Sequence, residues 1–222
     1  MREVKGMKKT LYSLMLDEAV VREIDKQAHL RGTNRSALVN QILAEYADMV
    51  TPERRIQDIF RQIGEILDAD RELVPYVAPN ALTMSMKSSL QYRYRPTVKY
   101  SVELYRERGR ALGELSVVFR TQSEELLEAM SRFFRLWRQV EDELIAGYLA
   151  EPVEYALYPG RFSRTISVPT RRDYTTADIA GAISAYVRLF DRLMKGALGG
   201  QLSAADVREE YIRWLQAGNI IL

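Results

Sequence analysis

The fold is decided first in residues 8–49, KKTLYSLMLDEAVVREIDKQAHLRGTNRSALVNQILAEYADM. This stretch begins with apolar side chains at every second position, which is typical of a strand with two distinct faces. One face would hold Tyr12, Leu14 and Leu16, and the other Leu11, Ser13 and Met15. The apolar spacing then changes to three and four residues, which indicates amphipathic helices.

Two short helices are predicted after the strand. Asp17 can cap the first, and Gly32 can end it because glycine readily adopts the left-handed conformation found beyond helix ends. Its apolar stripe consists of Val20, Val21, Ile24 and Ala28. Thr33 or Asn34 can cap the second helix. The apolar face of that helix consists of Leu38, Val39, Ile42, Leu43 and Tyr46.

This segment is too small to be stable alone. One strand and two helices in roughly 40 residues bury little apolar surface, and a single strand has no neighbour for its backbone hydrogen bonds. Two copies can supply both the strand partner and the missing surface. The sequence therefore favours a homodimer held together by this segment.

The order of elements and the turn RGTNRSALVNQIL, residues 31–43, resemble the ribbon-helix-helix family of DNA-binding proteins, of the Arc, MetJ and CopG type. The resemblance covers residues 8 to about 49, about a fifth of the chain. It implies that the strands of two chains pair as an antiparallel ribbon in the major groove of DNA. The four helices would intertwine beneath that ribbon.

The resemblance also implies which residues contact DNA. The base-facing side chains would be Leu11, Ser13 and Met15. The phosphate clamp at the start of the second helix would be Thr33, Asn34, Arg35 and Ser36. A helix N-terminus suits this role because its free N–H groups and positive dipole end attract anions. Lys8 and Lys9 lead into the ribbon from a basic N-terminal arm and are expected to contact DNA as well.

The strand departs from the family pattern. Family ribbons usually present polar or cationic side chains, whereas Leu11 and Met15 can make only apolar contacts, for instance to a thymine methyl group. A register shifted by one residue would instead present Thr10, Tyr12 and Leu14. The first register is preferred because it turns Leu14 and Leu16 towards the helices.

The composition, with 47% hydrophobic and 28% charged residues, is that of an ordinary globular protein, and a net charge of +2 indicates no partner. There is no cysteine, which excludes disulfides, thiolate catalysis and cysteine metal sites. The single histidine, His29, lacks partner ligands for a metal and is expected at the surface or half-buried.

No apolar run approaches the roughly 20 residues of a membrane span, and residues 1–30 lack a signal-peptide core. We therefore expect a cytoplasmic protein.

A second unit, residues 51–222, is predicted to follow the DNA-binding module of residues 1–50. Thr51, Pro52 and Glu53 form a helix start, and the apolar residues after them continue at helical spacing. Pro75 and Pro79 then predict a break over residues 73–80.

Antiparallel strands are predicted from residue 82 onwards, where the apolar period falls to two. The alternating residues are Leu82, Met84, Met86; Val98, Tyr100, Val102, Leu104; Leu115, Val117, Phe119; Val153, Tyr155, Leu157; and Phe162, Ile166, Val168. Turns are expected at residues 106–110, which contain Gly109, and at Pro159–Gly160. The expected architecture is α+β, with a sheet of four to six strands packed against helices on one face.

Two long helices, over about residues 123–148 and 176–195, carry apolar seams that suit packing within one chain or across a dimer axis. The seams are Leu126, Met130, Phe133, Trp137, Val140 and Leu144 in the first, and Ile179, Ile183, Tyr186, Phe190 and Leu193 in the second. A last helix is predicted to start at Ser203, with Asp206 in a variant of the capping box, and to end at Gly218.

The chemistry of residues 51–222 is less distinctive. The sequence shows no phosphate-binding glycine loop and no carboxylate cluster at metal spacing, and its single histidine could serve at most one Ser/His/Asp triad. No enzyme activity, metal site or cofactor is therefore predicted. Basic residues interleaved with Tyr92, Tyr94 and Tyr100 could bind an anionic effector or a second stretch of nucleic acid. The candidates for the effector site are Arg93, Arg95 and Lys99. A second basic group contains Arg161, Arg164, Arg171 and Arg172. The alternative is a solvated sheet face whose tyrosines pack under long side chains.

The function indicated by the sequence is that of a homodimeric, DNA-binding regulator of transcription, whose residues 51–222 serve assembly or effector sensing. The alternative is an antitoxin, in which the same DNA-binding module is joined to a toxin-binding part. Antitoxin tails are typically short and fold on binding, whereas about 170 residues here carry their own sheet and helix pattern. The regulator is therefore favoured.

Overall fold

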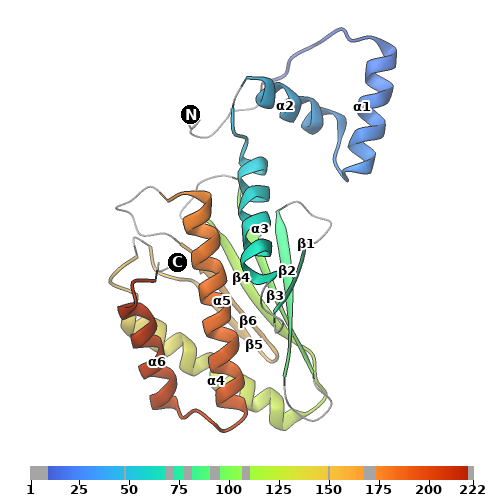
Figure 1. Cartoon of the computed structure of the whole chain (residues 1–222). Coiled ribbons are helices and arrows are strands. Elements are labelled where there is room, and N and C mark those ends of the chain that lie inside the picture. Colours follow the sequence, from blue (N-terminus) through green and yellow to red (C-terminus); the bar gives the residue numbers. More distant parts are fainter. Residues whose placement is uncertain are drawn as a thin grey trace.

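The computed structural model describes residues 10–47, 49–68, 73–77, 82–90, 96–106, 111–149, 151–167 and 174–219. Over these residues the chain is α+β, with six helices and one six-stranded antiparallel sheet (Figure 1), as predicted. The helices are α1 (Glu18–Leu30), α2 (Arg35–Tyr46), α3 (Pro52–Asp68), α4 (Glu124–Leu144), α5 (Thr176–Leu198) and α6 (Ala204–Gln216). The strands are β1 (Val74–Val77), β2 (Thr83–Ser89), β3 (Thr97–Leu104), β4 (Gly113–Phe119), β5 (Tyr155–Tyr158) and β6 (Arg161–Ile166).

The sheet has the strand order β1-β2-β3-β4-β6-β5, and every neighbouring pair is antiparallel. Its central strands alternate between buried and more exposed side chains, so the predicted period of two is confirmed. Gly160 has a φ of 69° in the turn between β5 and β6, as expected from Pro159–Gly160. A Cβ atom at Gly160 would also lie 2.7 Å from the carbonyl oxygen of Phe119, so this turn requires glycine for two reasons.

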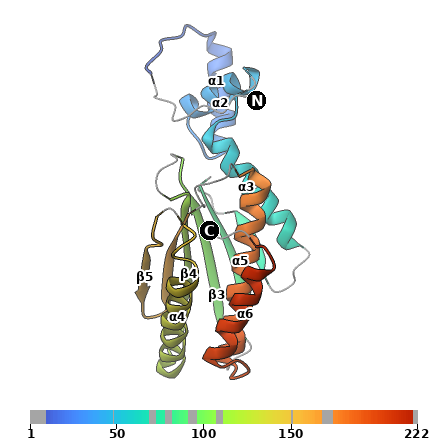
Figure 2. The ribbon, with the colours of Figure 1, turned by 90° about the vertical axis from the view of Figure 1, so that its left-hand side faces the viewer.

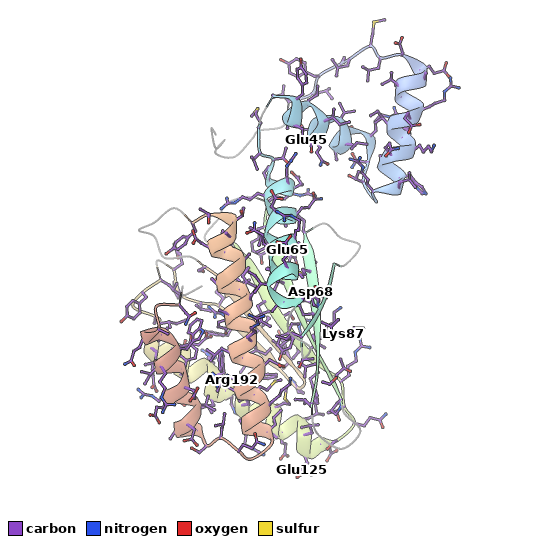
Figure 3. All side chains as sticks on the ribbon, viewed as in Figure 1. Glu45, Glu65, Asp68, Lys87, Glu125 and Arg192 are labelled. Atoms are coloured by element: carbon purple, nitrogen blue, oxygen red, sulfur yellow. The ribbon has the colours of Figure 1, made fainter. Side chains whose placement is uncertain are left out.

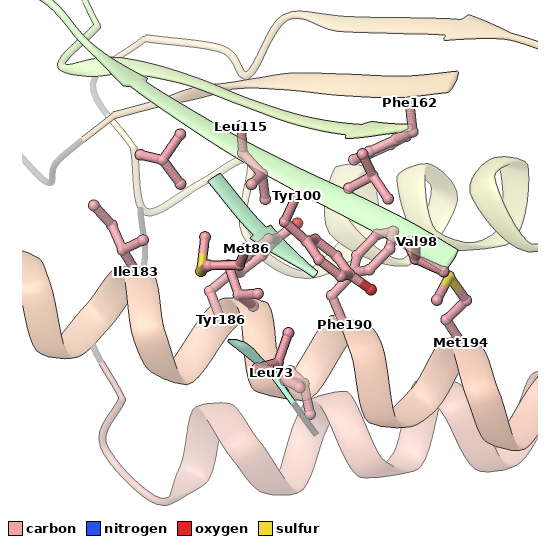
Figure 4. Close-up of a cluster of buried hydrophobic side chains, with 14 of the residues drawn as sticks. Leu73, Met86, Val98, Tyr100, Leu115, Phe162, Ile183, Tyr186, Phe190 and Met194 are labelled. Carbon is pink, nitrogen blue, oxygen red and sulfur yellow. The ribbon is translucent and has the colours of Figure 1, made fainter. Parts of the chain in front are cut away.

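Helices cover one face of the sheet, which we call the inner face. Helix α5 lies along it, as the close-up in Figure 4 shows, and packs against α3, α4 and α6. Phe190 of α5 lies at the centre of the core, with ring centroids 4.8 Å from Trp137, 5.4 Å from Phe162 and 6.2 Å from Tyr100. Strands and helices far apart in sequence therefore meet in one aromatic cluster. The opposite, outer face of the sheet carries mainly hydroxyl and charged side chains.

Both long helices use their apolar seams within the chain. Trp137 of α4 is fully buried and donates from its indole nitrogen to the hydroxyl of Tyr186 at 2.8 Å. The seams therefore form a core within one chain. The sequence also allowed these helices to pack across a dimer axis, and that alternative is wrong. Helix α6 begins with the predicted capping box, in which the backbone N–H of Asp206 donates to Ser203 and the N–H of Ser203 donates to the Asp206 carboxylate at 2.8 Å. Gly218 follows the helix with a φ of 79°.

The predicted break over residues 73–80 contains a strand that the sequence did not reveal. Strand β1 pairs with β2 at the edge of the sheet, and Pro75 lies opposite Met86. Proline is tolerated there because an edge strand can leave one side of its backbone without ladder hydrogen bonds. Propensity alone could not reveal this, since proline argues against a strand anywhere except at an edge.

Helices α1 and α2 lie beyond the start of α3, apart from the sheet and its helices, in both views of the chain (Figures 1 and 2). The hydroxyl of Thr51 caps α3 by accepting from the N–H of Arg54 at 3.2 Å, and Pro52 is the first helical residue, as predicted. An ion pair of 2.6 Å joins Arg54 of α3 to Glu45 of α2. Among the described helices, none is both long and apolar enough to cross a membrane.

Replacing Trp137 by alanine should reduce the free energy of unfolding by about 3–5 kcal/mol, because the change leaves a large cavity and removes the hydrogen bond from the indole to Tyr186. Urea denaturation followed by circular dichroism measures this loss. Arg135→Ala, at an exposed position of the same helix, is the matched control and should change stability by less than about 0.5 kcal/mol. Equal effects of the two substitutions would contradict the central position of Trp137.

Candidate nucleic-acid interface

Residues 11–16, which the sequence predicts to form a strand of the DNA-binding ribbon, have no regular secondary structure within a single chain. Their side chains are open on both faces: Leu11 is 97% exposed, Tyr12 82% and Leu14 60%. Ser13 and Met15 are exposed as well. The proposed base-facing residues are therefore accessible, but so are the residues expected to face the helices. A ribbon needs a strand from a second chain, so its formation stays a prediction.

The turn between α1 and α2 has the predicted geometry. Gly32 has a φ of 61°, and the side-chain oxygen of Asn34 accepts from the N–H of Ala37 at 2.9 Å. Asn34 rather than Thr33 is thus the cap of α2. The first intrahelical bond runs from Leu38 N–H to Asn34, so the N–H groups of Arg35 and Ser36 point out of the helix end. This exposed helix start can receive a phosphate group.

Arg35, expected in the phosphate clamp, already has an acidic partner. Its guanidinium forms a two-point ion pair with Asp25 of α1, with Nε 2.6 Å from Oδ1 and Nη2 paired with Oδ2. Hydrogen bonding to Arg35 lowers the pKa of Asp25. Both side chains are about half exposed, and such surface pairs contribute little net stability. A phosphate placed at the helix start could therefore share or take over this guanidinium.

The helices of the N-terminal unit leave most of their apolar stripes uncovered. Only Ala28 and Leu38 are buried among their described residues, where α1 packs on α2. The exposed apolar side chains of residues 10–47 are Leu11, Tyr12, Leu14, Met15, Leu16, Val20, Leu30, Ile42, Leu43 and Tyr46. Isolated exposed apolar residues are normal, but so many from one 38-residue segment form an unpartnered surface.

The remaining predicted site residues have different outcomes. Lys8, Lys9, Arg93 and Arg95 lie outside the described residues. Lys99 is exposed on the outer face of β3, but the neighbouring Tyr100 is fully buried and donates to Asp191 at 2.7 Å. The interpretation of Tyr100 as part of an interleaved binding surface is therefore wrong, because successive strand residues point to opposite faces.

Arg164, assigned from the sequence to a second basic patch, is buried in the core instead. Its guanidinium lies 2.8 Å from the carboxylate of Glu141, which is also fully buried. The same carboxylate accepts from the hydroxyls of Tyr155 at 2.9 Å and Tyr211 at 3.1 Å. The guanidinium also lies 4.6 Å from the ring centroid of Tyr186. The sequence signal was the alternation of Phe162, Arg164 and Ile166, which places Arg164 on the inner face.

The hydrogen-bonding groups of this cluster are paired with one another. Burial raises the pKa of Tyr155, and the negative charge of Glu141 raises it further. The same two causes raise the pKa of Tyr211. Both tyrosines thus remain protonated donors over the whole neutral range. Every group in the cluster has a protein partner, which indicates a structural network that joins α4, β5, β6 and α6.

A shallow groove lies between α3 and the β1 edge of the sheet, where Figure 3 labels Glu65 and Asp68. Two of its three charged lining residues, Arg61 and Glu65, form an ion pair of 2.7 Å, and Asp68 is the third. Among the described residues, no three acidic, histidine or cysteine side chains converge to form a metal site. The groove thus lacks the convergent charge of an ion-binding site.

No protein-family model, curated protein or solved structure matches this chain. Its function is therefore inferred from its own residues. Ten of the fourteen exposed large hydrophobic side chains in the described part of the chain lie in the N-terminal unit.

Replacing Glu141 by glutamine should destabilise the fold by about 3–5 kcal/mol, because Arg164 would become a buried charge without a counter-charge. Chemical denaturation gives the value. A double variant, Glu141→Gln with Arg164→Met, removes both charges while the amide oxygen can still accept from the two tyrosines, and should recover most of the lost stability. If the double variant were as unstable as the sum of its two single variants, the pair would not be coupled as described.

Proposed function

We propose that this protein is a homodimeric, DNA-binding regulator of transcription, with residues 1–50 as a ribbon-helix-helix module. The observation that carries the proposal is the uncovered apolar surface of residues 10–47 beside a capped helix start. A lone chain gains little from this segment, whereas a second copy offers an identical apolar surface. We propose the second copy as the partner for this reason.

Burial of the apolar stripe supplies the free energy of this association. Full burial of a leucine, isoleucine or similar side chain stabilises by about 1.5–3 kcal/mol. Ile42 is 42% exposed, Leu43 55% and Val20 47%, so four interlocking helices have much area left to cover. Strand pairing would also satisfy the backbone groups of residues 10–16.

The proposed contacts with DNA divide into two kinds. Leu11, Ser13 and Met15 would face the base edges from the ribbon. The helix start, with the outward N–H groups of Arg35 and Ser36, would bind backbone phosphate together with Thr33 and Asn34, and Lys8 and Lys9 would add charge. The antitoxin alternative receives less support, because residues 52–219 contain a folded core in their described part and not a tail that waits for a partner.

Ser13→Pro should abolish binding to DNA, because proline in the ribbon removes a ladder hydrogen bond and disfavours strand pairing. Binding is measured by gel shift on DNA selected from a random library with the unaltered protein, at a stated salt concentration. Ser13→Ala is the control: it should retain affinity within a few-fold but change the preferred sequence. Undiminished binding by Ser13→Pro would refute the ribbon.

Arg35→Ala should weaken binding to all sequences alike and reduce the slope of log affinity against log salt by about 0.9, the value of one phosphate contact. The slope is obtained from binding constants at several salt concentrations. Arg135→Ala on α4 makes the same charge change away from the N-terminal unit and should leave the slope unchanged. A changed sequence preference with an unchanged slope would contradict the phosphate role of Arg35.

A further inference from the structure

The outer face of the sheet carries an ordered pattern of side chains in three parallel rows. Because the strands are in register, the residues of each row lie opposite one another on neighbouring strands. The serine row contains Ser85, Ser101, Ser116, Ser163 and Ala156 on β2, β3, β4, β6 and β5, and Tyr76 of β1 lies opposite Ser85 at its end. The acidic row, on one side of it, contains Thr83, Glu103, Glu114, Thr165 and Glu154. The basic row, on the other side, contains Val74, Lys87, Lys99, Val118, Arg161 and Tyr158.

The two flanking rows have opposite charge. The acidic row holds three glutamates and no cation, and the basic row holds two lysines and one arginine and no acid. In the part of the chain that the structure describes, Glu103, Lys99 and Arg161 are exposed and form no ion pair. Glu103 and Glu114 lie directly opposite one another on β3 and β4, so two carboxylates of the acidic row are immediate neighbours.

From β2 to β5 the middle of the face is made of small side chains. Ser85 and Ser163 are buried, Ser101 and Ser116 are half-buried, and the hydroxyls of Ser85 and Ser101 lie 3.2 Å apart. Serine and alanine allow another backbone to approach closely, whereas lysine and glutamate in the flanking rows reach further out. The helices that fill the core contact the inner face, so their side chains do not use this pattern.

We propose that the outer face is an interface between two copies of this chain, stacked face to face about a twofold axis that runs along the serine row. A rotation of 180° about that line exchanges the acidic and basic rows. Each acidic row then lies over the basic row of the other copy, and serine lies over serine. Two sheets stacked in this way are about 10 Å apart.

The charge pattern selects this axis over the alternative. A twofold axis parallel to the strands would place glutamates over glutamates and cations over cations, which like-charge repulsion opposes. The axis along the serine row keeps each strand over its own equivalent, so Glu103 of β3 lies over Lys99 of the second copy. Glu114 lies between Lys99 and Arg161 of the second copy, and the twofold repeats each contact.

The size of the face fits a specific but modest contact. Six strands at about 4.8 Å spacing and three rows of side chains span about 24 by 20 Å, or about 500 Å² per copy. A total of about 1,000 Å² lies at the lower end for specific interfaces. This contact does not rest on the proposed ribbon, but a ribbon joining the same two chains would strengthen it by raising their effective concentration.

The test uses the full chain with Ser13→Pro, which disrupts the proposed ribbon and leaves the sheet unaltered. Sedimentation equilibrium at low salt should still show dimers. Lys99→Glu or Glu103→Lys in this chain should raise the dissociation constant by at least about tenfold, because each places like charges opposite one another. The combined charge swap, Lys99→Glu with Glu103→Lys, should restore association.

A cross-linking measurement tests the axis directly, because the chain contains no cysteine. Ser116→Cys places two thiols on either side of the axis, so a short bis-maleimide should join two copies. Glu128→Cys, exposed on α4, is the control and should not cross-link.

Absence of cross-linking together with no effect of the charge reversals would overturn the proposal. Loss of DNA binding on Lys99→Glu with unchanged association would also overturn it and would assign the basic row to nucleic acid. Loss of DNA binding by Ser13→Pro alone bears only on the ribbon.

Discussion

The ring of Phe190 connects the layers of this protein. It lies on the inner side of α5 and contacts Phe133, Phe134 and Trp137 of α4 as well as strand residues Tyr100 and Phe162. Aromatic pairs at such distances add stability beyond the area that they bury. Because α4 and α5 converge on this ring, their apolar seams are buried inside one chain. Any assembly of the protein must use other surfaces.

In the part of the chain that the structure describes, the N-terminal unit and the outer face of the sheet both remain open, and they differ in kind. The N-terminal unit exposes apolar side chains, so its association would depend on burial and weaken little with salt. The outer face of the sheet is polar and charge-patterned, so its association would depend on complementarity and weaken as salt screens the charges. One surface would provide most of the affinity, and the other most of the orientation between the two copies.

Local patterns in the sequence predicted the fold well where period and capping agree. The alternation around Tyr100, the helix start at Pro52 and the capping box at Ser203 were all visible in the residues themselves. Arg164 and β1 were missed for different reasons. A buried arginine needs a distant counter-charge, here Glu141, and an edge strand with Pro75 needs a neighbour that accepts it. Pairings over such distances are decided by packing, which a single sequence does not display.

Symmetry limits how the two surfaces can be used together. A homodimer has one twofold axis, so the ribbon and the stacked sheets can join the same two chains only if both contacts share that axis. Helix α3 decides this, because it links the units and is held at its start by the ion pair of Arg54 with Glu45 and along its length by α5. If α3 directs the ribbon axis away from the serine row, each contact joins a different pair of chains. The assembly then grows to a tetramer or beyond, and the DNA-binding units are presented in pairs at a spacing set by the sheet contact.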